Sequence, residues 1–343
     1  MLQLRRLPDL VVPGLSRPTY PWLLQELKPS LLISDESAEQ HGLRLTEVVG
    51  GETTTRRRLG SGGLLFGAAG VTLLNRKNRS ELIVGEQGRN RLTRLDPWGG
   101  SLLGHIADGW VRSPLALLAY HSRLFVSDVC YEKLHSECIG RVVVYNARTL
   151  IAIRAIDSSA LPSGQRLHPH GLAALQARNG TRQLFVADAD SGVIHAFSFR
   201  GVLLRTIGSV GTGPLQFIHP RGLLMLPADA PVTRESPSPG PRGHYLIVAE
   251  RQRVQALHVA ADGVLSAEGV RSTQRLAFEQ DSNLLGMCAS AGRILIADVS
   301  RNRVAVLRMF TDGHARATTK SGAGIVEEDA PRRRLELRTR RVI

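Results

Sequence analysis

A short pattern that recurs six times along the chain constrains its fold most strongly. Each copy is an apolar, partly β-branched run that ends in an acidic residue. The copies are Leu31–Asp35, Leu82–Glu86, Leu124–Asp128, Leu184–Asp188, Leu246–Glu250 and Leu295–Asp298. Successive acids are 51, 42, 60, 62 and 48 residues apart, spacings that suit a repeated supersecondary unit. Because each run is short, apolar and followed by turn-forming residues, each predicts a buried strand.

The fourth unit shows most clearly what lies between these runs. Four strands are predicted there, at residues 171–175, 183–187, 193–198 and 202–207. No long segment with helical periodicity separates the strands, which argues against β-α-β units. Four short strands in a unit of about 40–50 residues are typical of a propeller blade. The sequence therefore predicts an all-β fold, a six-bladed β-propeller of four-stranded blades.

The repeated motifs resemble a known family. Phe217-Ile-His-Pro-Arg-Gly-Leu223, Leu184-Phe-Val-Ala-Asp188 and Asn302-Arg-Val304 are similar to successive parts of an NHL repeat. The resemblance extends over about residues 20–318 and is weaker in the first and third units. It implies a propeller of six NHL-type blades, the same number as the repeat count.

Domain boundaries follow from the extent of the repeats. We expect an N-terminal lead-in at residues 1–19, the propeller at 20–318, and a basic, flexible C-terminal tail at 319–343. The last blade needs an outer strand to close the ring. Either residues 314–318 or Leu2–Leu4 could supply it, and the sequence does not choose between them.

Charge is the main compositional signal. The chain has 343 residues with 44 Lys and Arg against 30 Asp and Glu, a net charge of +14. Arginine dominates the basic residues, an excess that codon bias or phosphate and carboxylate recognition could explain. The absence of any run of 18 apolar residues predicts no membrane span. We expect a cytoplasmic monomer; three arginines among the first residues leave a mitochondrial location as the alternative.

Basic residues follow the acid in several units, and the fold would place them on one rim of the propeller. This candidate binding rim consists of Arg89, Arg91, Lys133, Arg251, Arg253, Arg301 and Arg303. A basic rim suits phosphate or an acidic protein surface, and some NHL domains bind single-stranded RNA on a basic face. For Arg91 and Arg303, a structural pair with the acid of the blade is the favoured interpretation. An aromatic content of only 5% weakens the RNA hypothesis.

Histidines raise the question of a metal. Peptidylglycine-amide lyases, which resemble NHL proteins, place one His after Pro in three blades to hold zinc. His170 in Pro169-His170-Gly171 matches one such position, but Arg221 and Leu115 occupy the two equivalent ones. A single His cannot make a three-histidine zinc site. His168 and His219 could still gather with His170 at the mouth of the channel.

Cysteines give a second weak metal candidate. Cys130, His135 and Cys138 follow Asp128 in one loop, but their spacing is not that of a zinc ribbon or finger. A disulfide or two unpaired thiols are the alternatives. Cys288 lies in an apolar strand and is interpreted as a core residue.

The function predicted from these features is a non-catalytic NHL-type propeller that serves as a protein-binding scaffold. Such a ring carries variable loops on two rigid faces. Neither a phosphate-binding loop nor a G-x-S-x-G nucleophile motif is present. Single-stranded RNA binding through the rim is one alternative, and a metal-dependent propeller enzyme of lyase or lactonase type is the other. We expect no cofactor and a protein partner.

Overall fold

The computed structural model describes residues 2–10, 15, 18–24, 30–35, 42–49, 52–60, 62–76, 79–129, 140–177, 179–227, 243–260, 270–290 and 292–311. All of them belong to one compact unit, Met1–Gly313. The loop that holds Cys130, Lys133, His135 and Cys138 lies outside the described residues, as do the segment 314–318 and the tail at 319–343. No described helix is long and apolar enough to cross a membrane.

Six antiparallel four-stranded sheets form the fold, and they are the blades of a propeller. The first three blades follow one another along the chain: β2 (Pro18–Leu24), β3 (Ser30–Asp35), β4 (Gly42–Val49) and β5 (Glu52–Leu59); β6 (Ala68–Arg76), β7 (Arg79–Glu86), β8 (Arg91–Leu95) and β9 (Leu102–Ile106); β10 (Pro114–Tyr120), β11 (Arg123–Asp128), β12 (Arg141–Asn146) and β13 (Ala152–Ile156).

The remaining blades complete the ring: β14 (Pro169–Gln176), β15 (Arg182–Asp188), β16 (Val193–Ser198) and β17 (Leu203–Ile207); β20 (Gly222–Pro227), β21 (Gly243–Ala249), β22 (Arg253–Ala260) and β23 (Val270–Ala277); β24 (Leu284–Ser290), β25 (Arg293–Asp298), β26 (Arg303–Thr311) and β1 (Leu2–Leu10). Between blades four and five, β18 (Ser209–Val210) pairs with β19 (Gln216–Phe217) in parallel. Two short 3-10 helices, η1 (Gln87–Arg89) and η2 (Ser158–Ala160), lie in loops.

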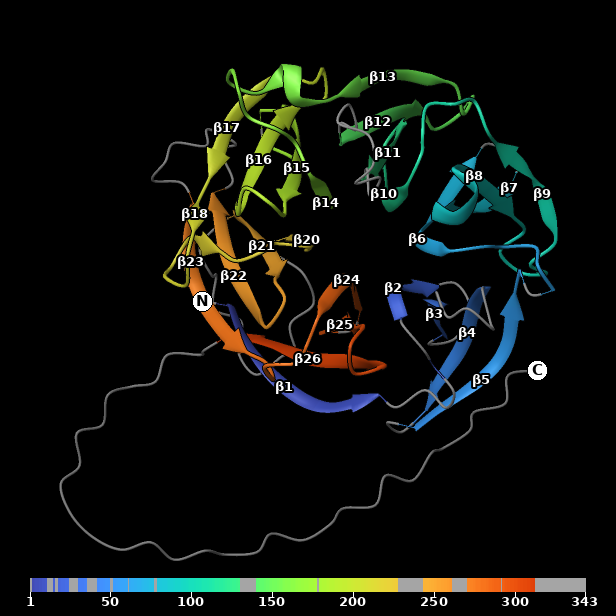
Figure 1. Cartoon of the computed structure of the whole chain (residues 1–343). Coiled ribbons are helices and arrows are strands. Elements are labelled where there is room, and N and C mark those ends of the chain that lie inside the picture. The colour runs from blue at the N-terminus through green and yellow to red at the C-terminus, as the bar shows by residue number, and fades with distance from the viewer. Residues whose placement is uncertain are drawn as a thin grey trace, which may run out of the picture. The chain divides into compact units, whose positions relative to one another are not determined.

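The first strand of each blade faces the centre of the ring. In Figure 1, β2, β6, β10, β14, β20 and β24 stand innermost, and each of these strands contacts the innermost strands of the neighbouring blades. The outermost strands are β5, β9, β13, β17, β23 and β1. Residues just before an innermost strand therefore gather around the axis on one face of the propeller.

The core is divided among the blade interfaces. Six apolar clusters each join the facing sides of two neighbouring blades. In β11, Leu124 and Val126 pack toward blade two, whereas Phe125 between them packs toward blade four. Side chains alternate between the two faces of a strand, so a strand covered on both faces must be apolar throughout. This explains the continuous apolar runs of the repeat.

The N-terminal segment closes the ring. β1 pairs antiparallel with β26, from Leu2 opposite Thr311 to Leu10 opposite Val304. The cluster that contains Ile33 of blade one with Leu295 and Val304 of blade six joins the two ends of the ring. Of the two segments considered for closure, the N-terminal one therefore supplies the outer strand. The expected lead-in at residues 1–19 instead contains β1 and the start of β2.

Candidate functional site

In four blades, the repeated acid binds the loop that leads into the first strand of the same blade. Asp128 Oδ1 accepts hydrogen bonds from the backbone N–H groups of Arg112 and Ser113, at 2.8 and 2.6 Å. Glu86 and Glu250 accept one backbone N–H each from the corresponding loops, at 2.9 and 2.7 Å. Asp298 accepts the N–H of Asn283 at 3.0 Å. In these four blades the acid therefore has a structural role, which explains why an acidic residue recurs at the end of the apolar run.

An arginine at the start of the third strand neutralises this acid in four blades. The ion pairs are Arg91–Glu86 at 2.8 Å, Arg141–Asp128 at 3.1 Å, Arg253–Glu250 at 2.8 Å and Arg303–Asp298 at 3.0 Å. All four carboxylates are buried. A buried carboxylate requires a partner of opposite charge, so these arginines have a role in stability. The structural pairs expected for Arg91 and Arg303 are both present.

Other residues of the candidate binding rim are also engaged. Arg89 contacts Glu86 at 3.2 Å and donates to the carbonyls of Gly63 and Leu64, each at 2.8 Å. Arg301 pairs with Asp281 at 2.6 Å on the surface. Arg251 is exposed, with no side-chain partner in the part of the chain that the structure describes. Little uncompensated positive charge is therefore left on the described rim.

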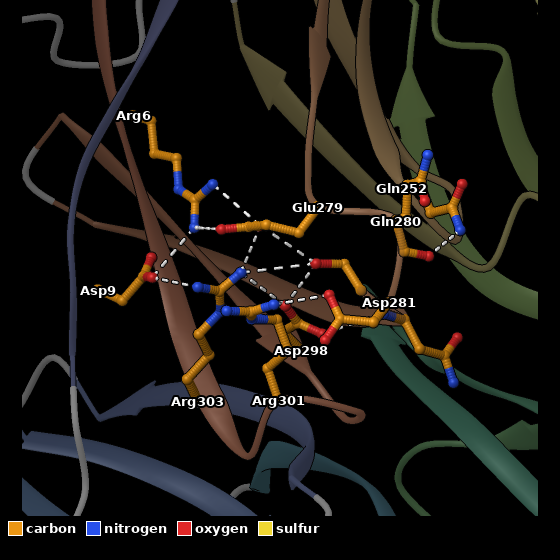
Figure 2. A network of polar contacts seen from close by, with 11 residues as sticks. Arg6, Asp9, Gln252, Glu279, Gln280, Asp281, Asp298, Arg301 and Arg303 are labelled. Carbon is orange, nitrogen blue, oxygen red and sulfur yellow. Dashed lines mark hydrogen bonds and ion pairs between the residues drawn. The ribbon is translucent and has the colours of Figure 1, made fainter.

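Arg303 is the centre of a polar network that includes residues of β1 (Figure 2). Besides Asp298, its guanidinium binds Asp9 of β1 at 2.7 Å and Glu279 at 2.6 Å. Arg6 of β1 joins the network through Asp9 at 3.1 Å and Glu279 at 2.9 Å. Hydrogen bonds from Arg303 and then Arg6 lower the pKa of Glu279 well below its usual range. The network ties β1 to β26, at the place where the ring closes.

A groove between blades two and three has a volume of about 930 Å³. Its floor is the fully buried carboxylate of Glu81. Three arginines of blade two reach this carboxylate, Arg76 at 3.2 Å, Arg79 at 2.6 Å and Arg94 at 2.8 Å. Burial alone would raise the pKa of Glu81, but the hydrogen bonds from Arg94 and Arg79 outweigh it and lower the pKa.

Blade three supplies the other wall of this groove. Arg148, Ile151 and the loop residues Asp108 and Trp110 line it. Ile151 is 66% exposed and Trp110 38% exposed. Arg76 donates to the carbonyl of Arg148 at 2.5 Å and so joins the two walls. Four arginines face two carboxylates here, and the groove combines positive charge with exposed apolar surface. The sequence analysis did not predict this groove. The close succession of Arg76, Arg79 and Glu81 in one hairpin was the only sequence feature that indicated a charged site there.

The next blade interface repeats this arrangement on a smaller scale. A cavity of about 300 Å³ between blades three and four is lined by Arg123, Arg154, Arg182 and Arg200 together with Val144, Ile153 and Phe199. Arg154 donates to the carbonyl of Arg200 at 2.5 Å, as Arg76 does to Arg148. Arg148 and Arg200 are both exposed and both lie in the turn between the third and fourth strands of their blades. Arg148 and Arg200 therefore occupy equivalent positions in blades three and four.

The histidines named by the sequence lie on the axial side of blades four and five. His170 is the second residue of β14 and is buried, whereas His168 and His219 lie in the loops before β14 and β20. Arg221 directly precedes β20, and Leu115 is the second residue of β10. Within the described ranges, no group of three or more His, Cys, Asp or Glu residues is arranged to hold a metal ion. Cys288 is buried in the core, as the sequence predicts.

Comparisons with known proteins identify the fold and no more. No family model matches the chain, and no curated protein sequence matches it. A structure of a catalytically inactive virginiamycin B lyase from Staphylococcus aureus with quinupristin is similar, with a TM-score of 0.54 and 10% identity over 90% of this chain and 99% of that one. The selenomethionine-substituted lyase from the same organism has a TM-score of 0.50 and 13% identity over the same shares.

This fold is a six-bladed β-propeller. Identities of 10% and 13% carry the architecture alone. The function must therefore be argued from the surfaces of this chain.

Proposed function

We propose that this protein is a non-catalytic propeller of NHL type that binds an acidic segment of a partner protein in the groove between blades two and three. The observation that carries the proposal is the joint presence of four arginines, Trp110 and exposed Ile151 around one cavity of about 930 Å³. Ligand sites commonly have volumes of this order. Tryptophan and arginine are also the side chains that dominate binding energies at protein interfaces.

Charge supports an acidic partner. Glu81 engages Arg76, Arg79 and Arg94, and Asp108 accepts a hydrogen bond from Tyr145 at 3.2 Å. Arg148 remains exposed at the rim of the groove, with no side-chain partner within the described ranges. A carboxylate of a bound segment would meet Arg148, and an adjacent apolar side chain of that segment would pack on Trp110 and Ile151. The repeated blade motifs support the NHL-type assignment.

The test uses a displayed library of random linear peptides as the probe. We expect enrichment of peptides that combine acidic and apolar residues, and a loss of their affinity of about tenfold or more in Arg148→Glu and Ile151→Glu. Arg200→Glu is the matched control, because Arg200 occupies the corresponding turn of blade four. Equal losses in Arg148→Glu and Arg200→Glu, or no enrichment at all, would refute the proposal.

Single-stranded RNA is the alternative ligand for the same measurement. Labelled RNA that binds with a steep salt dependence and loses affinity in Arg251→Ala would assign the basic rim to nucleic acid instead. Binding of RNA that is unaffected by that change but abolished by Arg148→Glu would assign the groove to nucleic acid.

A further inference from the structure

Equivalent positions in the blades surround the axis on one face. They lie at the start of the innermost strands and are Ala69, Leu115, His170, Arg221 and Leu285 in blades two to six. In four of these blades the sheet register shifts at this point, between Ala68 and Val71, Pro114 and Leu117, Pro169 and Leu172, and Leu284 and Met287. Such bulges re-aim a side chain out of the regular sheet pattern.

Polarity at these positions is uneven. Blades two, three and six have the apolar residues Ala69, Leu115 and Leu285, all of them buried. Blades four and five have His170 and Arg221 instead. Because the other three blades have an apolar residue at this position, the fold does not require a basic residue here. The two basic positions are an addition to the scaffold.

His170 and Arg221 lie on backbones that approach each other closely. A Cβ atom on Gly171 would lie only 2.5 Å from the carbonyl oxygen of Arg221. The loops before the two strands are also connected, because Ala189 donates to the carbonyl of His168 at 3.1 Å and accepts at 3.0 Å from the ring of His219. The Ala189 contact requires the protonated Nδ1 tautomer of His219. Two further histidines are thereby held beside the pair.

The surroundings of His170 are positive. Burial lowers the pKa of His170 far below its usual value, and His168, Arg221 and His219 lower it further. Among the nearby carboxylates, Asp190 lies 3.0 Å from His168 and is exposed. Asp188 lies 3.4 Å from His195 and accepts the backbone N–H of Ser191. Both carboxylates thus lie beside histidines other than His170.

The ring of His170 has a nitrogen without a hydrogen-bond partner among the described residues. The side chain of His170 is 4% exposed, and its Nδ1 makes no hydrogen bond to any described residue. Buried polar atoms in native proteins are nearly always hydrogen-bonded to protein, water or a ligand. Arg221 is held in place at the same time by a hydrogen bond of 2.6 Å from Nη1 to Asn283 Oδ1.

We propose that His170 and Arg221 bind an oxyanion, the carboxylate or phosphate group of a small ligand, beside His219 on this face of the propeller axis. Guanidinium and imidazole N–H groups are suitable donors to such a group, and Asn283 orients Arg221 toward it. The permanent charge of Arg221 repels a cation, so an anion is the ligand class that this cluster favours. The site is separate from the groove between blades two and three and does not depend on the function proposed for it.

The test follows the histidine side chains of the full-length protein by ¹⁵N-resolved NMR. Inorganic phosphate and succinate are titrated separately, with chloride keeping the ionic strength constant. We expect saturable shifts of the His170 and His219 ring signals with one of the two anions. Binding of the anion is also expected to move the titration of His170 to higher pH, because a negative charge favours its protonated form.

Three variants decide the assignment. Arg221→Met is expected to weaken anion binding at least tenfold. His170→Leu is expected to do the same in a folded protein, because blade three has Leu115 at the equivalent position. Arg200→Met is the control and should leave binding unchanged, because Arg200 is exposed and lies in the turn between β16 and β17 of blade four.

Each outcome has one meaning. Saturation by phosphate alone or by succinate alone identifies the group that the site recognises. No saturable shift with either anion overturns the proposal, as does equal binding by wild type and Arg221→Met. Arg148→Glu in the groove should not affect these titrations, so failure here and failure of the proposed protein-binding function remain distinguishable.

Discussion

Replacement of Arg303 by Met should destabilise the propeller, because it breaks a buried ion pair. The substitution removes the partner of Asp298, which is fully buried, and two further ion pairs to Asp9 and Glu279. Breaking a buried pair costs about 3–5 kcal/mol, because one charge is left uncompensated. Asp298 keeps hydrogen bonds from Ser282 and the backbone of Asn283, at 2.9 and 3.0 Å. We therefore expect a loss near the lower limit, about 3 kcal/mol.

The partly exposed members of the network add little to this value. Glu279 retains Arg6 as a partner after the change, and its side chain is 35% exposed, so solvent screens what is lost. Arg301→Met is the matched control, since Arg301 and Asp281 form a surface pair whose side chains are 34% and 67% exposed. An exposed pair of this kind contributes about 0–1 kcal/mol.

Denaturant unfolding of the two variants measures the difference, and hydrogen exchange locates it. Because Arg303 joins β26 to Asp9 of β1, we expect faster exchange of the β1 amides in Arg303→Met and unchanged exchange in Arg301→Met. Equal stabilities of the two variants, or unaltered protection of β1, would show that the network does not hold the ring closed.

Two more changes test the packing at the axis and the acid of blade four. Gly222→Ala should cost about 1–3 kcal/mol in denaturant unfolding, because the added Cβ would lie 2.1 Å from the Leu285 carbonyl oxygen. Gly213→Ala, which meets only the Gln216 side chain, should cost less; equal costs would contradict the close-approach argument. For Asp188, burial raises the pKa, but the His195 ring 3.4 Å away and the hydrogen bond from the Ser191 N–H outweigh this and lower the pKa. The Asp188 contribution to stability is thus present above about pH 4 and lost as pH falls through the folded-state pKa, so Asp188→Asn should flatten the decline of unfolding free energy in acid.

Sequence reasoning predicted the blades because their signals are local. The four strands expected in blade four correspond to β14–β17 with small differences at the ends. The apolar runs are recognisable because both faces of each strand are covered. The structural partners of Arg91 and Arg303 followed from the same repeat, since acid and arginine lie within a few residues of each other.

The closing strand was harder to recognise. Pro8 interrupts the segment Leu2–Leu10, and a proline argues against a central strand. β1 is an outermost strand, however, and its register shifts between Leu7 and Leu10, where a missing N–H is tolerated.

The groove depends on contacts that sequence spacing does not reveal. Arg94 reaches Glu81 from a different strand, and Arg148 belongs to the next blade. The same holds for His170 and Arg221, whose proximity comes from the approach of two blades rather than from either motif alone.

The pairing of β1 with β26 also affects how the chain reaches its folded state. Leu2 pairs with Thr311, which lies about 300 residues later in the chain. Most other strand pairs are hairpins between consecutive strands and can form early, whereas blade six must wait for nearly the whole propeller. Long-range pairings of this kind slow folding, because the entropy of closing the loop is lost before the contacts form. Until then, β26 presents an unpaired edge, so aggregation during refolding should originate at blade six and should be suppressed by an added peptide with the sequence of residues 2–10.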